Sequence, residues 1–185
     1  MTTTELHPII ARRYSPRAFD PARPVESEVL LALLEAARWA PSSFNSQPWR
    51  FMVGQRGEAT YARLLDALTE GNRAWAQHAP VLILTVAQEQ GPRGPLRYAW
   101  HDVGLATAQL ILQATALGLH AHPMAGFAKQ AVRAAFAIPD EFAPVLVLAV
   151  GYLPEAAGPA EAAARTRLPL AEIAFQGQWG QPFTP

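Results

Sequence analysis

Hydrophobic and polar positions alternate along this chain with two different periods, which divide it into helices and strands. Apolar residues recur at helical spacing between residues 26 and 39, which predicts a helix that Pro41 ends. Residues 81–87 form a continuous apolar run of a length typical of a central strand. The segment between these elements contains a second, shorter strand pattern at residues 50–54.

The same periods predict further helices at residues 4–12, 58–69, 72–78 and 129–136, and strands at residues 119–124 and 144–152. Residues 88–96 contain two prolines and two glycines, which predicts a loop. The order of helices and strands lacks the regular alternation of a doubly wound fold. It favours an α+β fold in which helices flank a sheet.

The longest predicted helix, residues 98–117, is apolar on nearly every side and about 30 Å long. A helix of this kind must be covered all round, and a small chain has few elements for that purpose. A homodimer packed on this helix is the favoured explanation, and a central helix wrapped within one subunit is the alternative. The Pro-, Gly- and Ala-rich tail, residues 153–185, contains Ile173, Phe175, Trp179 and Phe183 and is predicted to pack on another surface.

Composition places the chain as a single domain spanning residues 1–185, with half of its residues hydrophobic. The 15 basic and 15 acidic residues cancel, which argues against nucleic acid or an anionic membrane as a partner. The chain has no cysteine, so thiol catalysis and disulfides are excluded. The N-terminus has no secretory pattern, and the uncharged stretch 103–128 contains too many polar residues for a membrane span, so the expected location is the cytoplasm.

A polar loop lies between the helix that ends before Pro41 and the strand at residues 50–54. Its Ser42, Ser43, Asn45, Ser46 and Gln47 offer hydrogen-bond donors and acceptors without a permanent charge. This chemistry suits a planar ligand with several polar edges, and a loop between two rigid elements is well placed to hold one. The alternative is that these residues only end the helix and form local turns.

Two arginine clusters lie near opposite ends of the chain. Residues 12–17 contain three arginines and Ser15, and Arg165 and Arg167 form the second cluster. Guanidinium groups bind phosphate in a bidentate manner, so both clusters could hold one phosphomonoester. Surface arginine is the alternative, because 14 of the 15 basic residues of this chain are arginines.

Other common chemistries have little support in the sequence. The chain has no G-x-G-x-x-G pattern after a strand, no Walker lysine and no G-x-S-x-G elbow. His120 and His122 alternate on a predicted strand, but no third ligand lies near them in the sequence, so no metal site is predicted.

Taken together, the motifs resemble those of the FMN-dependent nitroreductase family over about residues 9–172. The matching segments are Arg13 to Phe19, the loop from Ala40 to Trp49, Asn72 before the strand entry at Ala79-Pro80, Asp102-Val103-Gly104, His122 to Phe127, Val150-Gly151-Tyr152 and Arg165 to Leu170. The resemblance implies a central, mainly antiparallel sheet flanked by helices, with the long helix at a homodimer interface. It also suggests that the tail packs on the partner subunit.

The resemblance implies two FMN sites per dimer, each made by both subunits. The phosphate segment would comprise Arg13, Tyr14, Ser15, Arg17, Arg165 and Arg167. The flavin ring would meet Asn72, and the segment Pro123, Met124, Ala125 and Gly126 would lie along it. The partner subunit would supply Pro41, Ser42, Ser43 and Asn45.

The implied activity is the reduction of nitroaromatic, quinone or similar small acceptors by NADH or NADPH in a ping-pong cycle. The flavin carries this chemistry, so no side chain is named as catalytic and no metal is expected. Two alternatives remain: a related flavin enzyme that acts on an enone, an aldehyde or a peptide-derived ring, and a flavin-binding protein without turnover.

Overall fold

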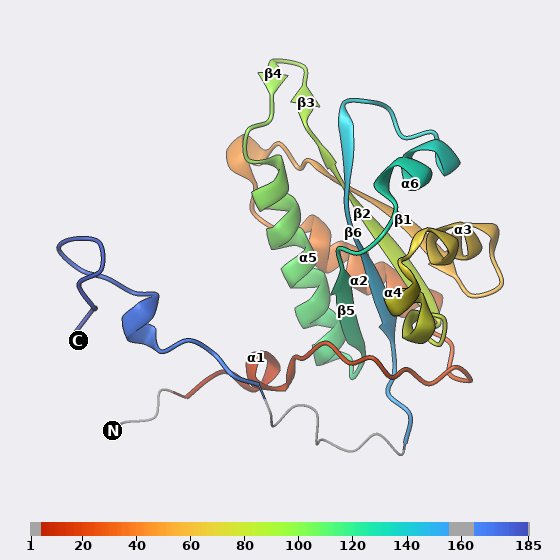
Figure 1. Cartoon of the computed structure of the whole chain (residues 1–185), viewed down its shortest axis with the longest axis horizontal. Coiled ribbons are helices and arrows are strands. Elements are labelled where there is room, and N and C mark those ends of the chain that lie inside the picture. Colours follow the sequence, from red (N-terminus) through yellow and green to blue (C-terminus); the bar gives the residue numbers. More distant parts are fainter. Residues whose placement is uncertain (1–4, 156–164, 185) are drawn as a thin grey trace.

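The computed structural model describes residues 5–155 and 165–184 and contains a four-stranded sheet at its centre. The strands follow the order β1, β2, β6, β5, and each pairs with its neighbour in antiparallel register. Their bounds are β1 Trp49–Gln55, β2 Val81–Gln88, β5 His120–Met124 and β6 Phe142–Gly151. Helices lie on both faces of the sheet, as Figure 1 shows. The predicted α+β architecture is therefore confirmed.

Strand β2 is apolar throughout because both of its faces are covered. Val81 and Ile83 pack with α2 (Ser27–Arg38) and α5 (Ala99–Ala116). Leu82 and Leu84 point to the opposite face, where they pack with helices α3, α4 and α6. Those three helices span Ala59–Ala67, Glu70–Ala76 and Lys129–Ala135. Successive side chains of a strand alternate between its faces, so a strand buried on both sides shows no polar alternation.

Two predicted elements differ from the observed ones. The first helix, α1, spans only Pro8–Arg12, and residues 1–4 lie outside the described part of the chain. The prediction of a loop at residues 88–96 is wrong, because β3 (Gln90–Gly91) and β4 (Gly94–Pro95) pair as a short hairpin. Gly94 adopts φ +111°, a conformation that favours glycine and allows the tight turn after Arg93.

Helix α5 is buried along one side and open along the other. Val103, Ala106 and Leu110 are buried among α2 and the sheet. The opposite side carries an outward ridge at four-residue spacing, with no charged residue among its members: Trp100, Gly104, Ala108, Leu112 and Ala116. Leu112 is half-buried and the other four are exposed. The described residues of one chain therefore leave an apolar strip of this helix uncovered.

The C-terminal residues 165–184 run away from the body of the molecule, as the blue segment in Figure 1 shows. They contain a single helical turn, Leu170–Glu172, and an isolated bridge between Phe175 and Pro182. Their large apolar side chains are exposed: Leu168, Leu170, Ile173, Trp179 and Phe183. A search of the described residues for a helix long and apolar enough to cross a membrane finds none.

Candidate functional site

The two arginine clusters of the sequence surround one cavity of about 420 Å³, which we call the arginine cavity. Its lining comprises Arg13, Tyr14, Ser15, Arg17, Arg165 and Arg167. The clusters meet because the Arg165 guanidinium donates hydrogen bonds to the backbone carbonyls of Arg13 and Ala11. The C-terminal segment is thereby tied to the N-terminal one, although more than 150 residues separate them in sequence.

Four guanidinium groups at one cavity create a strong preference for an anion. Burial, and then the neighbouring charges of Arg165 and Arg167, lower the pKa of Arg13 below its usual value. Arg13 Nη1 also lies 3.4 Å from Ser15 Oγ, to which it donates. A phosphate would relieve the repulsion among these groups and accept several charge-assisted hydrogen bonds.

The two histidines of strand β5 contact residues 14–16, which belong to the N-terminal segment at the arginine cavity. Tyr14 is buried and meets the His120 ring edge-on, with the ring centroids 4.9 Å apart. His122 Nδ1 donates to the Pro16 carbonyl oxygen at 2.9 Å, which places the proton on that nitrogen. Burial lowers the pKa of both histidines, which favours their neutral forms. The alternation of these histidines along the strand thus serves packing against residues 14–16.

A second group of predicted site residues surrounds the end of β5. Asn72 Nδ2, from α4, donates to the Gly126 carbonyl oxygen at 3.0 Å, and Thr69 donates to the same oxygen through its backbone N–H and its hydroxyl. A Cβ on Gly126 would lie 2.8 Å from Asn72 Nδ2 and 2.9 Å from Thr69 Oγ1, so both side chains would have to shift. Residues 123–126 are therefore fixed against α4.

Burial decides which parts of residues 123–126 could face a ligand. The Met124 side chain is buried in the core between the sheet and α3, α4 and α6, so only its backbone is available to a ligand. Ala125 is exposed, and Pro123 is half-buried. This group connects to the arginine cavity through His122, whose ring lies 4.5 Å from that of Trp75 in α4. A phosphate in the cavity and a planar group along residues 123–126 would thus lie on neighbouring elements.

The polar loop after α2, residues 41–47, lies elsewhere, and we call it the serine loop. It contains a short 3-10 turn, Ser43–Asn45, in which Phe44 and Asn45 adopt φ +50° and +55°. Gln47 N donates to Ser42 Oγ at 3.0 Å, which closes the loop on itself. Such left-handed conformations in residues other than glycine persist only where the surrounding structure holds them.

Asp102 in the first turn of α5 anchors the serine loop. Its carboxylate is buried, and Oδ2 accepts a hydrogen bond of 2.9 Å from the backbone N–H of Ser43. Its second oxygen lies 3.0 Å from His101 Nδ1. In the sequence, Asp102 lies near the start of an apolar helix, where an acidic side chain interacts favourably with the helix dipole. Only the fold shows that this acid also holds a loop 59 positions away.

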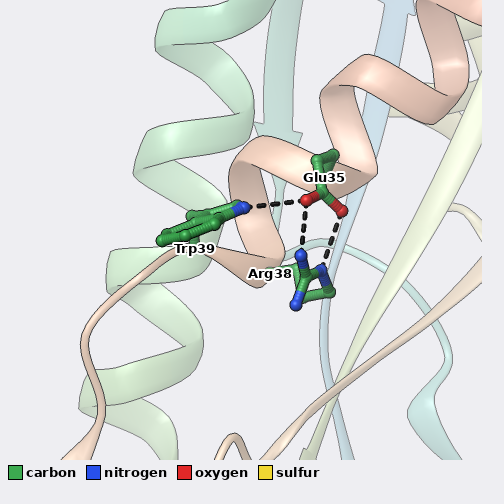
Figure 2. Close-up of polar contacts among 3 residues, drawn as sticks. All are labelled: Glu35, Arg38 and Trp39. Atoms are coloured by element: carbon green, nitrogen blue, oxygen red, sulfur yellow. Dashed lines mark hydrogen bonds and ion pairs between the residues drawn. The ribbon is translucent and has the colours of Figure 1, made fainter.

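The end of α2 is fixed by a second polar cluster just before the serine loop. Glu35 accepts hydrogen bonds from Arg38 and from Trp39 Nε1, the latter at 2.7 Å (Figure 2). These hydrogen bonds lower the pKa of Glu35 to about 2. Trp39 is held in place although it is largely exposed, so the chain enters the serine loop from a defined position.

The serine loop and the arginine cavity lie at opposite ends of α5. Asp102 contacts the loop from the first turn of the helix, whereas Tyr14 contacts His120 just after its last turn. The 18 residues of α5 span about 27 Å. Pro41, Ser42, Ser43 and Asn45 are therefore separated within one chain from the six residues of the arginine cavity.

This chain is similar in sequence and in structure to known proteins of one family. It matches the family model described as "Nitroreductase family" over residues 10–77 and 59–152. An uncharacterized 15.4 kDa protein of Mycolicibacterium smegmatis is 42% identical over 147 residues, which cover 72% of this chain and 99% of that protein. A putative NADH dehydrogenase/NAD(P)H nitroreductase of Xanthomonas oryzae is 37% identical over 133 residues, covering 61% and 67%.

Among solved structures, an oxidoreductase described as containing FMN superimposes with a TM-score of 0.88 at 34% identity. The superposition covers 97% of this chain and 95% of that one. The similarity in sequence and in structure therefore extends over both ends of α5.

Proposed function

The chain belongs to the nitroreductase family, and from this premise we propose that it is an FMN-dependent oxidoreductase. It would use NADH or NADPH to reduce nitroaromatic, quinone or similar small acceptors in a ping-pong cycle. The observation that carries the proposal is the arginine cavity, which gathers four guanidinium groups and a serine hydroxyl beside a fixed glycine segment. The FMN of one superimposable oxidoreductase and the nitroreductase names of several relatives support the same assignment.

The side chains of the cavity and of β5 suit the chemistry of FMN. Arg13, Ser15, Arg17, Arg165 and Arg167 would hold the phosphate, with Tyr14 packed behind them. Asn72 and the backbone of residues 123–126 would lie along the flavin ring, where Gly126 permits close approach. When bound, FMN would accept a hydride from the nicotinamide and pass the electrons to the acceptor. The chain would orient both ligands and needs no side-chain acid or base for this.

A second copy of the chain would complete the site. Within one chain, the serine loop and the arginine cavity lie at opposite ends of α5. Two chains packed antiparallel through the outward ridge of α5 would bring the serine loop of one to the arginine cavity of the other. Pro41, Ser42, Ser43 and Asn45 would then serve the partner's flavin. The uncharged ridge and the exposed apolar residues of the tail supply surfaces for such packing.

Purified protein tests the proposal directly. We expect a yellow dimer with flavin absorbance, bleached by NADH or NADPH without oxygen and reoxidised by a nitroaromatic or quinone. Flavin that neither nicotinamide bleaches would favour a flavin-binding protein without turnover. The flavin could instead be bleached and then reoxidised by an enone or aldehyde but not by a nitroaromatic or quinone. That result would favour a related flavin enzyme with a different acceptor. Protein that cannot be reconstituted with FMN would contradict all three readings.

A further inference from the structure

A second cavity, of about 560 Å³, lies between the serine loop and the β3–β4 hairpin, and we call it the loop cavity. Residues of both segments and of the start of α5 line it, among them Phe44, Asn45, Arg93, Arg97, Tyr98 and Asp102. In the proposed dimer the serine loop meets the partner's flavin. The loop cavity would then open beside the position where electrons leave the flavin.

Two arginines of the loop cavity have no partner among the described residues. Arg93 and Arg97 are exposed and make no hydrogen bond or ion pair with any described residue. By contrast, Arg56, Arg63 and Arg133 all donate to backbone carbonyls. The cavity also contains the acid Asp102, whose two oxygens are engaged by Ser43 N–H and His101.

A second acid near the hairpin, Glu89, is also engaged. Its Oε1 accepts from Trp100 Nε1 at 2.7 Å. The two free guanidinium groups thus favour an anionic group on the ligand.

The same cavity offers aromatic surface. Phe44 is 96% exposed, the highest value among the large hydrophobic residues, and Tyr98 is 61% exposed. Phe44 is held by a closed loop in a left-handed conformation, with Asp102 fixing the preceding backbone. An apolar ring presented to solvent in a strained, fixed conformation is typical of a residue that meets a ligand. A planar ring stacked on Phe44 would bury this surface.

We propose that the loop cavity selects planar aromatic acceptors that carry an anionic group, such as a carboxylate or a sulfonate. Arg93 and Arg97 bind the anionic group, and Phe44 packs on the ring. This inference rests on the proposed function, because it assigns the substrate class of that site. The phosphates of NADH and NADPH share the anionic chemistry, so the test separates acceptor from nicotinamide.

Isothermal titration of the oxidised holoprotein with 4-nitrobenzoate and with the neutral 4-nitrobenzamide measures selectivity without turnover. We expect the wild type to prefer the anion, with a preference that weakens as salt is added. R93Q/R97Q should reduce the ratio of the two affinities about tenfold. F44A should weaken both ligands together. R63Q, an exposed arginine outside both cavities, is the matched control and should leave the ratio unchanged.

Stopped-flow kinetics then assigns the effect to one half of the cycle. The double variant should slow flavin reoxidation by 4-nitrobenzoate but not flavin bleaching by NADH or NADPH. An unchanged affinity ratio, or slower bleaching with unchanged reoxidation, would overturn the inference. If bleaching and reoxidation by the neutral acceptor are normal in that case, the proposed function stands and only the acceptor assignment fails.

Discussion

The two cavities of this chain differ in how they are built. The arginine cavity joins segments from the two ends of the sequence and concentrates positive charge around a half-buried Arg13. The loop cavity is lined by the serine loop and by one continuous region, residues 88–102. It combines left-handed backbone conformations with an exposed aromatic ring. The first is suited to hold a permanent ligand tightly. The second presents an exposed aromatic ring and two arginines, which suits a ligand that must enter and leave.

Their separation along α5 is the more instructive difference. The proposed function needs groups from both regions, and α5 separates the arginine cavity from the serine loop within one chain. A function shared between two copies explains why an apolar ridge and an apolar tail stay exposed in the single chain. The first of the following predictions tests whether the arginine cavity and the serine loop form one site across two subunits.

The largest effect is expected from mixing two variants that are damaged at different cavities. R13A/R165A and S43A/N45A should each be almost inactive as homodimers. After subunit exchange, each heterodimer would contain one intact site, so about a quarter of the wild-type activity should return. Nitroreductase assays before and after exchange measure this. If no activity returns, both cavities serve the same chain's ligand and the shared-site proposal is wrong.

A single change in the arginine cavity should act on cofactor affinity. R13A removes a charge-assisted contact to phosphate worth about 2 kcal/mol, which corresponds to about a 30-fold weaker Kd for FMN. Titration of apoprotein with FMN, followed by fluorescence quenching, measures the change. Riboflavin, which lacks the phosphate, should bind wild type and variant equally. A loss of the same size for riboflavin would show that Arg13 acts on folding instead.

Alanine substitutions at two neighbouring glycines should have different effects on the free energy of unfolding. G126A places a Cβ within 3 Å of Asn72 and Thr69 and should lower the free energy of unfolding by about 2 kcal/mol. G71A, in α4, meets no neighbouring atom within 4 Å and should be neutral or slightly stabilising. Urea denaturation of both variants checks this. Equal stabilities would mean that residues 123–126 are not fixed against α4.

The smallest effect concerns the histidines beneath the arginine cavity. The pKa values of His120 and His122 are lowered in the folded state, so the unfolded chain takes up protons first as the pH falls below about 6.5. The free energy of unfolding should decrease from about pH 7.5 to about pH 5.5, by less than about 1.4 kcal/mol per pH unit for each half-exposed histidine. H122Q should make this decrease smaller. An unchanged pH dependence would contradict the assignment to His122.

The spacing of apolar residues along the chain was sufficient to predict most of the helices and strands. Strand β2 and helix α2 lie where they were predicted. A strand buried on both faces is a continuous apolar run, and a helix buried along one stripe has apolar residues at helical spacing, so both can be found in the sequence. The hairpin at residues 90–95 escaped prediction since its strands are two residues long, too short for any period. Its importance lies in the loop cavity, whose wall it forms.

Residue chemistry by itself predicted the candidate groups: clustered arginines for an anion, an uncharged polar loop for a planar ligand, and an apolar helix that needs cover. The resemblance to a family then assigned these groups to one cofactor. Only the tertiary structure decided where they lie. It joins Arg165 to Arg13, ties Ser43 to Asp102 and places the two cavities at opposite ends of α5. Contacts across so many residues depend on how the sheet and helices pack, which no local period encodes.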